Sequence, residues 1–119
     1  MQSVVQRRSY GSVEIFSLNN DLINKRLNER VEILSKDNNI LKIVLFGSFA
    51  TGKAVPGSDL DILIVLRESD KKLINRIEDF QEVFSDMGIA VDIFPYTIDE
   101  LENPVAINAL SAGKILYQA

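Results

Sequence analysis

The sequence predicts a small α/β domain in which helices pack on a mixed β-sheet. Apolar, β-branched runs of strand length alternate along the chain with amphipathic segments of helical spacing, which is the pattern of such folds. The chain has 119 residues, of which 46% are hydrophobic, and this size suits one core rather than two. We therefore expect a single domain over residues 1–119, with residues 1–16 as an extension whose structure the pattern does not specify.

The first predicted helix spans residues 20–36. Asn19 and Asn20 are both of a residue type that caps a helix N-terminus. Before them, residues 13–18 have the composition of a short strand. The apolar residues of the helix recur on one face, as packing against a sheet requires: Ile23, Leu27, Val31 and Leu34.

A second helix is predicted over residues 70–86. Gly88 follows it at the place where a C-terminal cap is expected. Four large apolar residues at helical spacing form the face that we expect to point inward: Leu73, Ile77, Phe80 and Phe84.

Three apolar runs predict strands at residues 40–46, 59–66 and 89–94. Pro95 is expected to stop the third, because proline cannot donate a ladder hydrogen bond. A short edge strand is expected at residues 115–117.

The C-terminal part carries clear helix-boundary signals. Thr97 followed by Glu100 has the spacing of a capping box. Pro104 is a favourable first helical residue, so a last helix is predicted from there to about Ala112, with Gly113 ending it.

The composition excludes several kinds of chemistry. The chain has no cysteine and no histidine, so disulfides, thiolate metal sites, cysteine nucleophiles and histidine acid–base catalysis are ruled out. The net charge of −4 is divided unevenly: residues 1–57 carry +3 and residues 58–119 carry −7. An acidic second half argues against binding of long nucleic acid. Without a secretory signal or a long apolar run, we expect a cytoplasmic protein that does not enter membranes.

Three aspartates are the candidate catalytic and metal-binding residues. Asp59 and Asp61 lie two apart on a predicted strand and so share a face, with Cβ atoms ~6.6 Å apart. Asp92 interrupts an otherwise apolar run, where an unpaired carboxylate is costly. Each acid has a structural alternative: a solvent-exposed strand end for the pair, and a lysine partner or a loop cap for Asp92. If the two strands are neighbours, the three oxygen donors suit Mg²⁺.

Gly47 and Ser48 follow the first predicted strand and form a candidate phosphate-binding turn. A helical turn over residues 49–53 would direct free backbone N–H groups toward an anion, although Gly-Ser after a strand often only makes a turn. The segment resembles a P-loop, but Ala54 replaces the hydroxyl residue of that motif and Pro56 prevents its long helix. A phosphatase D-x-D motif is also disfavoured, because here the acids precede the apolar run.

The combination resembles the minimal nucleotidyltransferases of the DNA polymerase β-like superfamily. The residues that carry the resemblance are Gly47-Ser48, then Asp59-Leu60-Asp61 after ten intervening residues, and a third acid at Asp92. Family members often carry arginine just before the second glycine, where this chain has Thr51, with Lys53 beyond Gly52.

The resemblance implies a nucleotidyltransferase fold and transfer of a nucleoside monophosphate, most simply AMP from ATP, to a hydroxyl. Asp59, Asp61 and Asp92 would be catalytic and would hold one or two Mg²⁺ ions, and Gly47 and Ser48 would bind the nucleotide. Minimal members commonly pair with a helical HEPN-domain protein in toxin–antitoxin modules, so the implied partner is a HEPN toxin and the implied role is that of its antitoxin. Two alternatives stay open: a non-catalytic binding module, and a small-molecule nucleotidyltransferase that acts as a homodimer.

Overall fold

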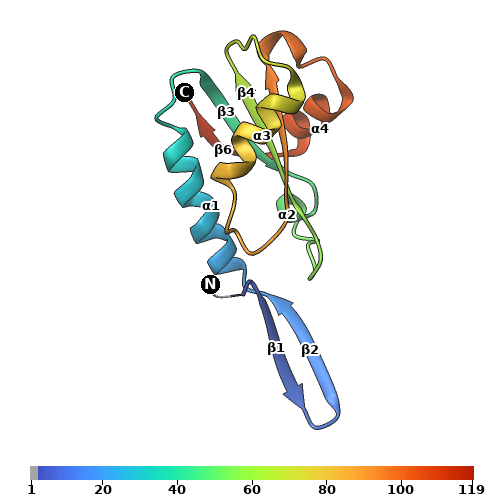
Figure 1. Cartoon of the computed structure of the whole chain (residues 1–119). Helices are drawn as coiled ribbons and strands as arrows, with labels where there is room; N and C mark the ends of the chain where they lie inside the picture. The colour runs from blue at the N-terminus through green and yellow to red at the C-terminus, as the bar shows by residue number, and fades with distance from the viewer. Residues whose placement is uncertain (1–2) are drawn as a thin grey trace.

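The structure, a computed structural model, describes residues 3–119 and consists of a four-stranded sheet, the helices packed on it and a separate two-stranded hairpin (Figure 1). The elements in chain order are β1 (Val5–Tyr10), β2 (Val13–Leu18), α1 (Asn20–Leu34), β3 (Ile40–Phe46), α2 (Ser48–Thr51), β4 (Leu60–Leu66), α3 (Leu73–Val83), β5 (Val91–Thr97), the 3₁₀ turn η1 (Ile98–Glu100), α4 (Pro104–Ala112) and β6 (Lys114–Gln118).

The main sheet is mixed and has the strand order β5-β4-β3-β6. β3 pairs antiparallel with both β4 and β6. β4 pairs in parallel with β5, and α3 supplies the crossover between them. The predicted α/β architecture with a mixed sheet is therefore confirmed.

Side chains of the central strands alternate between two apolar layers, as the period of a strand requires. One layer packs under α1 and under the segment that follows α3; it includes Ile23, Leu27, Ile43, Ile62, Phe84 and Ile93. The other packs under α4 and includes Val44, Phe46, Leu63, Val65, Ala106 and Ala109. Both faces of β3 and β4 are covered, which explains why these two strands read as continuous apolar runs.

The predicted boundaries are correct for α1, β3, α4 and β6 to within a residue or two. Asn19 is the N-cap of α1, and its side chain accepts a hydrogen bond from the Leu22 N–H at 3.1 Å. Asn103 caps α4 in the same way through the Ala106 N–H, and Gly113 follows as its C-cap. The capping box of Thr97 and Glu100 is present.

Three predictions about α3 were wrong: its bounds, the burial of Leu73 and the cap at Gly88. The helix covers only Leu73–Val83, and Leu73 on its first turn is 38% exposed rather than inward-facing. Gly88 does not cap the helix; it turns the chain toward β5 with φ of +75°. A side chain there would press on the Arg26 guanidinium, whose Nη1 donates to the Met87 carbonyl at 2.8 Å.

Pro95 does not end β5, contrary to expectation, because the strand continues to Thr97. β5 lies at the edge of the sheet, where a residue without an N–H is tolerated. The Pro95 carbonyl accepts a hydrogen bond from Arg76 Nη1 at 3.2 Å, so the proline is held from the α3 side.

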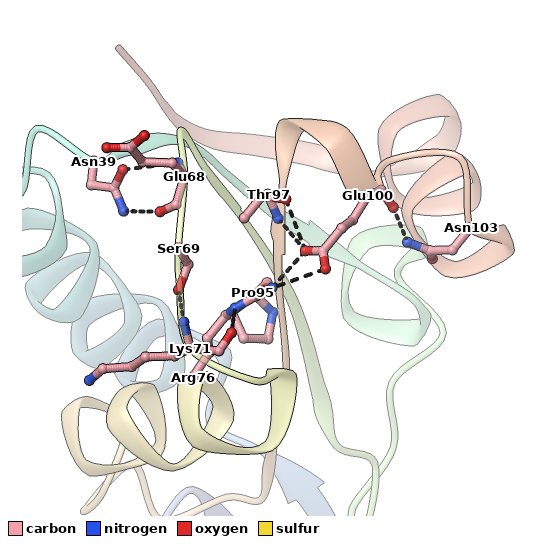
Figure 2. A network of polar contacts seen from close by, with 9 residues as sticks. All are labelled: Asn39, Glu68, Ser69, Lys71, Arg76, Pro95, Thr97, Glu100 and Asn103. Carbon is pink, nitrogen blue, oxygen red and sulfur yellow. Dashed lines mark hydrogen bonds and ion pairs between the residues drawn. The ribbon is translucent and has the colours of Figure 1, made fainter.

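Arg76 joins α3 to the end of β5 through a network that Figure 2 shows from close by. Its guanidinium is buried and donates to the Lys71 carbonyl at 3.0 Å and to Glu100 Oε1 at 2.6 Å. Glu100 also accepts from the Thr97 N–H at 2.8 Å. The Arg76 hydrogen bond, followed by the one from the Thr97 backbone, holds the pKa of Glu100 below its ordinary value.

Because of this network, the free energy of unfolding should decrease when the pH falls into the acid range. Because the pKa of Glu100 is lower in the folded chain than its ordinary 4.5, its contribution is complete above about pH 4.5 and is lost as pH falls through the lower folded value. We expect Glu100→Gln to lower the free energy of unfolding at pH 7 by about 1 kcal/mol, since water screens a carboxylate that is 41% exposed. Urea titrations between pH 3 and 7 measure the effect. Glu102→Gln, at a nearby exposed acid, is the control and should change little; equal effects of the two variants would contradict the assignment.

Candidate active site

The parallel pairing of β4 and β5 places Asp61 opposite Asp92. Their Cα atoms are register partners, and each residue is the second of its strand. Asp59 stands just before β4, two residues from Asp61. Asp61 is half-buried, whereas Asp59 and Asp92 are exposed. The three carboxylates therefore lie together at the end of the sheet where β4 and β5 begin.

The negative charges of Asp59 and Asp92 affect the ionisation of Asp61. The pKa of Asp61 lies above its ordinary value, first because burial disfavours the charged form and then because Asp92 and Asp59 repel it. A positive charge between the three would relieve that repulsion. The chemistry of the donor set therefore fits a hard divalent cation such as Mg²⁺.

The three carboxylates do not form a preformed metal-binding site. Within residues 3–119 no group of three Asp, Glu, His or Cys side chains is placed so that it could hold a metal ion as it stands. Any cation here would have to draw the acids inward and complete its shell with water or with substrate oxygens, which is how Mg²⁺ is commonly held.

Gly47 brings the end of β3 against the carboxylates. Phe46 is the register partner of Asp61, and Gly47 follows with φ of 76° and ψ of −153°. A Cβ atom on Gly47 would overlap Asp61 Oδ2. The close approach leaves no room for any side chain at this position.

α2 starts at Ser48, immediately after that glycine, and ends at Thr51, with Gly52 as its C-cap in the left-handed conformation. The first N–H groups of a helix lack acceptors within the helix, so this turn offers donors beside the acids. Lys53 is exposed, as is most of the loop after it. The Ser58 hydroxyl accepts a hydrogen bond from the Val55 N–H at 2.9 Å, which shapes the loop that leads into Asp59.

The sequence predicted a strand at residues 13–18, which is β2, but not β1 or the hairpin that the two strands form beside the acids. Its base contributes Val4, Val5 and Leu18 to a cavity of about 250 Å³ whose other walls include Ser58 and Asp59. The signal for the hairpin was present: Gly11-Ser12 is a two-residue link, with glycine first and φ of +62°, between two strand-like runs, and such links favour tight hairpin turns.

An aromatic row extends from the acids along the α4 face of the sheet, and the sequence did not reveal it. Phe46 and Phe94 have ring centroids 5.5 Å apart, and Phe94 and Tyr96 have centroids 6.5 Å apart with nearly parallel rings. The row joins β3 and β5 across β4, and Phe46 and Phe94 lie close in sequence or register to Asp61 and Asp92.

Comparison with known families assigns the class of protein. Residues 25–116 match the family described as nucleotidyltransferase domain. The chain belongs to that family, and the sequence-based expectation of membership is confirmed. The matched range contains every candidate site residue, and the hairpin lies before it.

Individual relatives agree with this class. A protein of Methanocaldococcus jannaschii that carries the provisional name protein adenylyltransferase is 28% identical over 86 residues, which is 66% of this chain and 58% of that protein. The chain thus spans less than two thirds of that relative's length.

Solved structures share the fold. A toxin–antitoxin structure with AMP-PNP superposes with a TM-score of 0.58 at 24% identity, covering 86% of this chain and 75% of the other. A complex of the tri-AMPylated HEPN toxin of Shewanella oneidensis with MNT antitoxin superposes with a TM-score of 0.59 at 20% identity, covering 82% and 73%. At these identities the likeness establishes the fold alone. Among the helices of residues 3–119, none has the length and apolar character needed to cross a bilayer.

The repulsion at Asp61 leads to a prediction about stability. Its pKa is higher in the folded chain than its ordinary 3.8, so the ionised form destabilises the fold at neutral pH, and this cost disappears as pH falls below the ordinary value. Without added metal, Asp61→Asn should raise the free energy of unfolding at pH 7 by up to about 1 kcal/mol, because water screens a half-exposed group. Thermal unfolding at pH 7 and pH 4 measures the change. Asp70→Asn, at an exposed acid, is the control, and a lower stability of Asp61→Asn at pH 7 would contradict the prediction.

Two glycines allow a test of the Gly47 contact. Gly47 and Gly52 have nearly equal φ, 76° and 74°, but space is open around Gly52. Gly52→Ala should cost about 1 kcal/mol, the usual cost of a left-handed alanine. Gly47→Ala should cost more, because its ψ lies in a region open essentially to glycine alone and its Cβ meets Asp61. Urea unfolding compares the two, and equal losses would show that the contact is unimportant.

Proposed function

We propose that the chain is an Mg²⁺-dependent nucleotidyltransferase that transfers AMP from ATP to a hydroxyl of a partner HEPN-domain toxin, and so acts as its antitoxin. The observation that carries the proposal is the register of β4 and β5, which sets Asp61 opposite Asp92 with Asp59 beside them. Membership in the nucleotidyltransferase domain family supports it. So does the relative named for protein adenylylation.

In this proposal the triphosphate lies against the turn of Gly47 and Ser48. The backbone of Gly47 can come close to a phosphate because it has no side chain, and the first N–H groups of α2 are donors for anionic oxygens. Ser48 adds a hydroxyl donor. Asp59 and Asp61 then face the same phosphates from the start of β4.

The transfer step needs positioning and neutralisation of charge rather than a histidine. The acceptor oxygen forms a bond to the α-phosphorus, the bond from that phosphorus to the β-phosphate bridging oxygen breaks, and pyrophosphate leaves. Asp92 is exposed and takes the hydroxyl proton. Bound Mg²⁺, held by Asp59, Asp61 and Asp92, would supply positive charge at the phosphates.

A protein is the acceptor that best fits the chain. Asp59 and Asp92 are exposed, and the hairpin base contributes only the wall of a cavity of about 250 Å³ beside Asp59. An acceptor-binding surface must therefore come from another molecule. The HEPN toxin that is AMPylated in the structurally similar complex is the kind of partner that would supply it.

The experiment mixes the chain with a co-encoded HEPN-domain protein, whose gene the proposal predicts beside that of the chain, together with ATP and Mg²⁺, and follows intact mass. We expect the partner to gain the mass of one or more AMP groups, and the gain to vanish with EDTA. Asp59→Asn with Asp61→Asn should slow transfer by roughly 10³-fold or more. Asp70→Asn at an exposed site is the matched control and should transfer normally.

The same assay separates catalysis from mere covering of the toxin. If the Asp59→Asn, Asp61→Asn variant still binds the partner but no longer neutralises it, chemistry is the mechanism. If the variant neutralises as well as the parent chain and no AMP is ever added, the protein is a binding module and the proposal is wrong. Comparison of ATP with GTP, CTP and UTP identifies the preferred base.

A further inference from the structure

The β1–β2 hairpin stands away from the rest of the molecule (Figure 1). All residues of β1 and all but Leu18 of β2 are exposed. The hairpin forms its own two-stranded sheet and accounts for much of the long dimension of a chain that measures 56 × 27 × 24 Å. A two-stranded hairpin alone is only marginally stable in water, so this one needs a surface to pack on.

The two faces of the hairpin differ in character. Residues opposite each other in an antiparallel pair share a face, so Tyr10 and Val13 lie beside Arg8 and Ile15. That face has three large, exposed apolar side chains around one cation. The other face also exposes an aromatic residue, Phe16, but there Arg7 pairs with Glu14 at 3.6 Å, whereas no carboxylate of residues 3–119 forms such a pair with Arg8. The first face, here called the Tyr10 face, is therefore apolar with an uncompensated positive charge.

Charge complementarity points to the chain itself as the partner surface. With Arg7, Arg8 and Glu14, the hairpin has a net charge of +1. Because the whole chain has a net charge of −4, the remainder has a net charge of −5. Residues 98–112, which form η1, the turn after it and α4, contain three acidic and no basic residues. A surface that is acidic and apolar is what the Tyr10 face requires.

α4 and the turn before it provide such a surface. Ile107 and Leu110 of α4 are 55% and 39% exposed, and Ile98 of η1 is 48% exposed. Asp99 and Glu102 lie in the same stretch and are also exposed. This surface, here called the α4 surface, is at the opposite end of the molecule from the hairpin (Figure 1), so a chain cannot fold its own hairpin onto it.

We propose that two copies of the chain associate side by side in antiparallel orientation, with the Tyr10 face of each hairpin packed on the α4 surface of the other copy. Because the hairpin and α4 mark opposite ends of one chain, a two-fold axis brings both pairs together at once and buries the same contact twice. The proposal involves no catalytic residue and does not rest on the proposed function.

The first test measures oligomeric state by light scattering and sedimentation on the purified chain without any partner. We expect a mass of twice 13.3 kDa that falls toward the monomer at high salt, since the contact includes opposite charges. A monomeric mass at roughly 100 µM, where a dimer of micromolar dissociation constant would be almost fully formed, would overturn the proposal.

Three isoleucines of similar exposure locate the contact. Ile15 on the hairpin, Ile107 on α4 and Ile33 on α1 are 51%, 55% and 59% exposed. Ile15→Asp and Ile107→Asp should each raise the dissociation constant at least tenfold, whereas Ile33→Asp, the matched control, should leave it unchanged. Circular dichroism checks that each variant is folded. A dimer that either of the first two variants leaves intact is assembled in another way, and the proposal fails.

Cross-linking tests the arrangement without relying on a destabilised hairpin. The chain has no cysteine, so introduced thiols report only the chosen positions. Ser12→Cys chains mixed with Asn108→Cys chains should give a strong hetero-linked product with a short bismaleimide, and Ser12→Cys mixed with Glu32→Cys on α1 should give little. The reverse pattern overturns the proposal. So does a chain that stays monomeric alone but whose Ile15→Asp variant loses binding to the HEPN-domain protein, because the hairpin would then serve that partner.

Discussion

The parallel alignment of β4 with β5 is the constraint on which the candidate site depends. It sets Asp61 and Asp92 opposite each other, and a shift of one residue would turn Asp92 to the other face of the sheet. At its far end β5 is anchored to α3, because Arg76 donates to the Pro95 carbonyl and to Glu100. The crossover helix thus does more than connect two strands, because its buried guanidinium also anchors the strand that carries Asp92.

Most of the main sheet could be predicted from the sequence, and for a physical reason. β3 and β4 are covered on both faces, so they consist almost wholly of apolar residues, and such runs are easy to recognise. The caps of α1 and α4 are local interactions between residues three apart, and local chemistry is visible in a sequence. The spacing of Gly47, Ser48, Asp59 and Asp61, with Asp92 further on, indicated a family that the comparison then confirmed.

The sequence-based predictions that were wrong concern features that depend on tertiary context. Pro95 was expected to end a strand, and it does not because β5 is an edge strand, a property set by the whole sheet. Leu73 matched the periodicity of an inward face, but it lies on the first turn of α3, where the helix has not yet reached the core. The second hairpin strand was predicted at residues 13–18 and is confirmed as β2. The first strand and the pairing were missed, because the residues of β1 are exposed on both faces and so show no pattern of burial.

The placement of β6 has a consequence for synthesis on the ribosome. β3 is complete at Phe46, but one of its two neighbours is β6, which begins only at Lys114. At about 5–20 residues per second, the 68 residues from Gly47 to Lys114 take roughly 3–14 s to translate. During that interval one edge of the buried strand β3 has no hydrogen-bonding partner, and an unpaired apolar strand edge favours association between nascent chains and binding of chaperones.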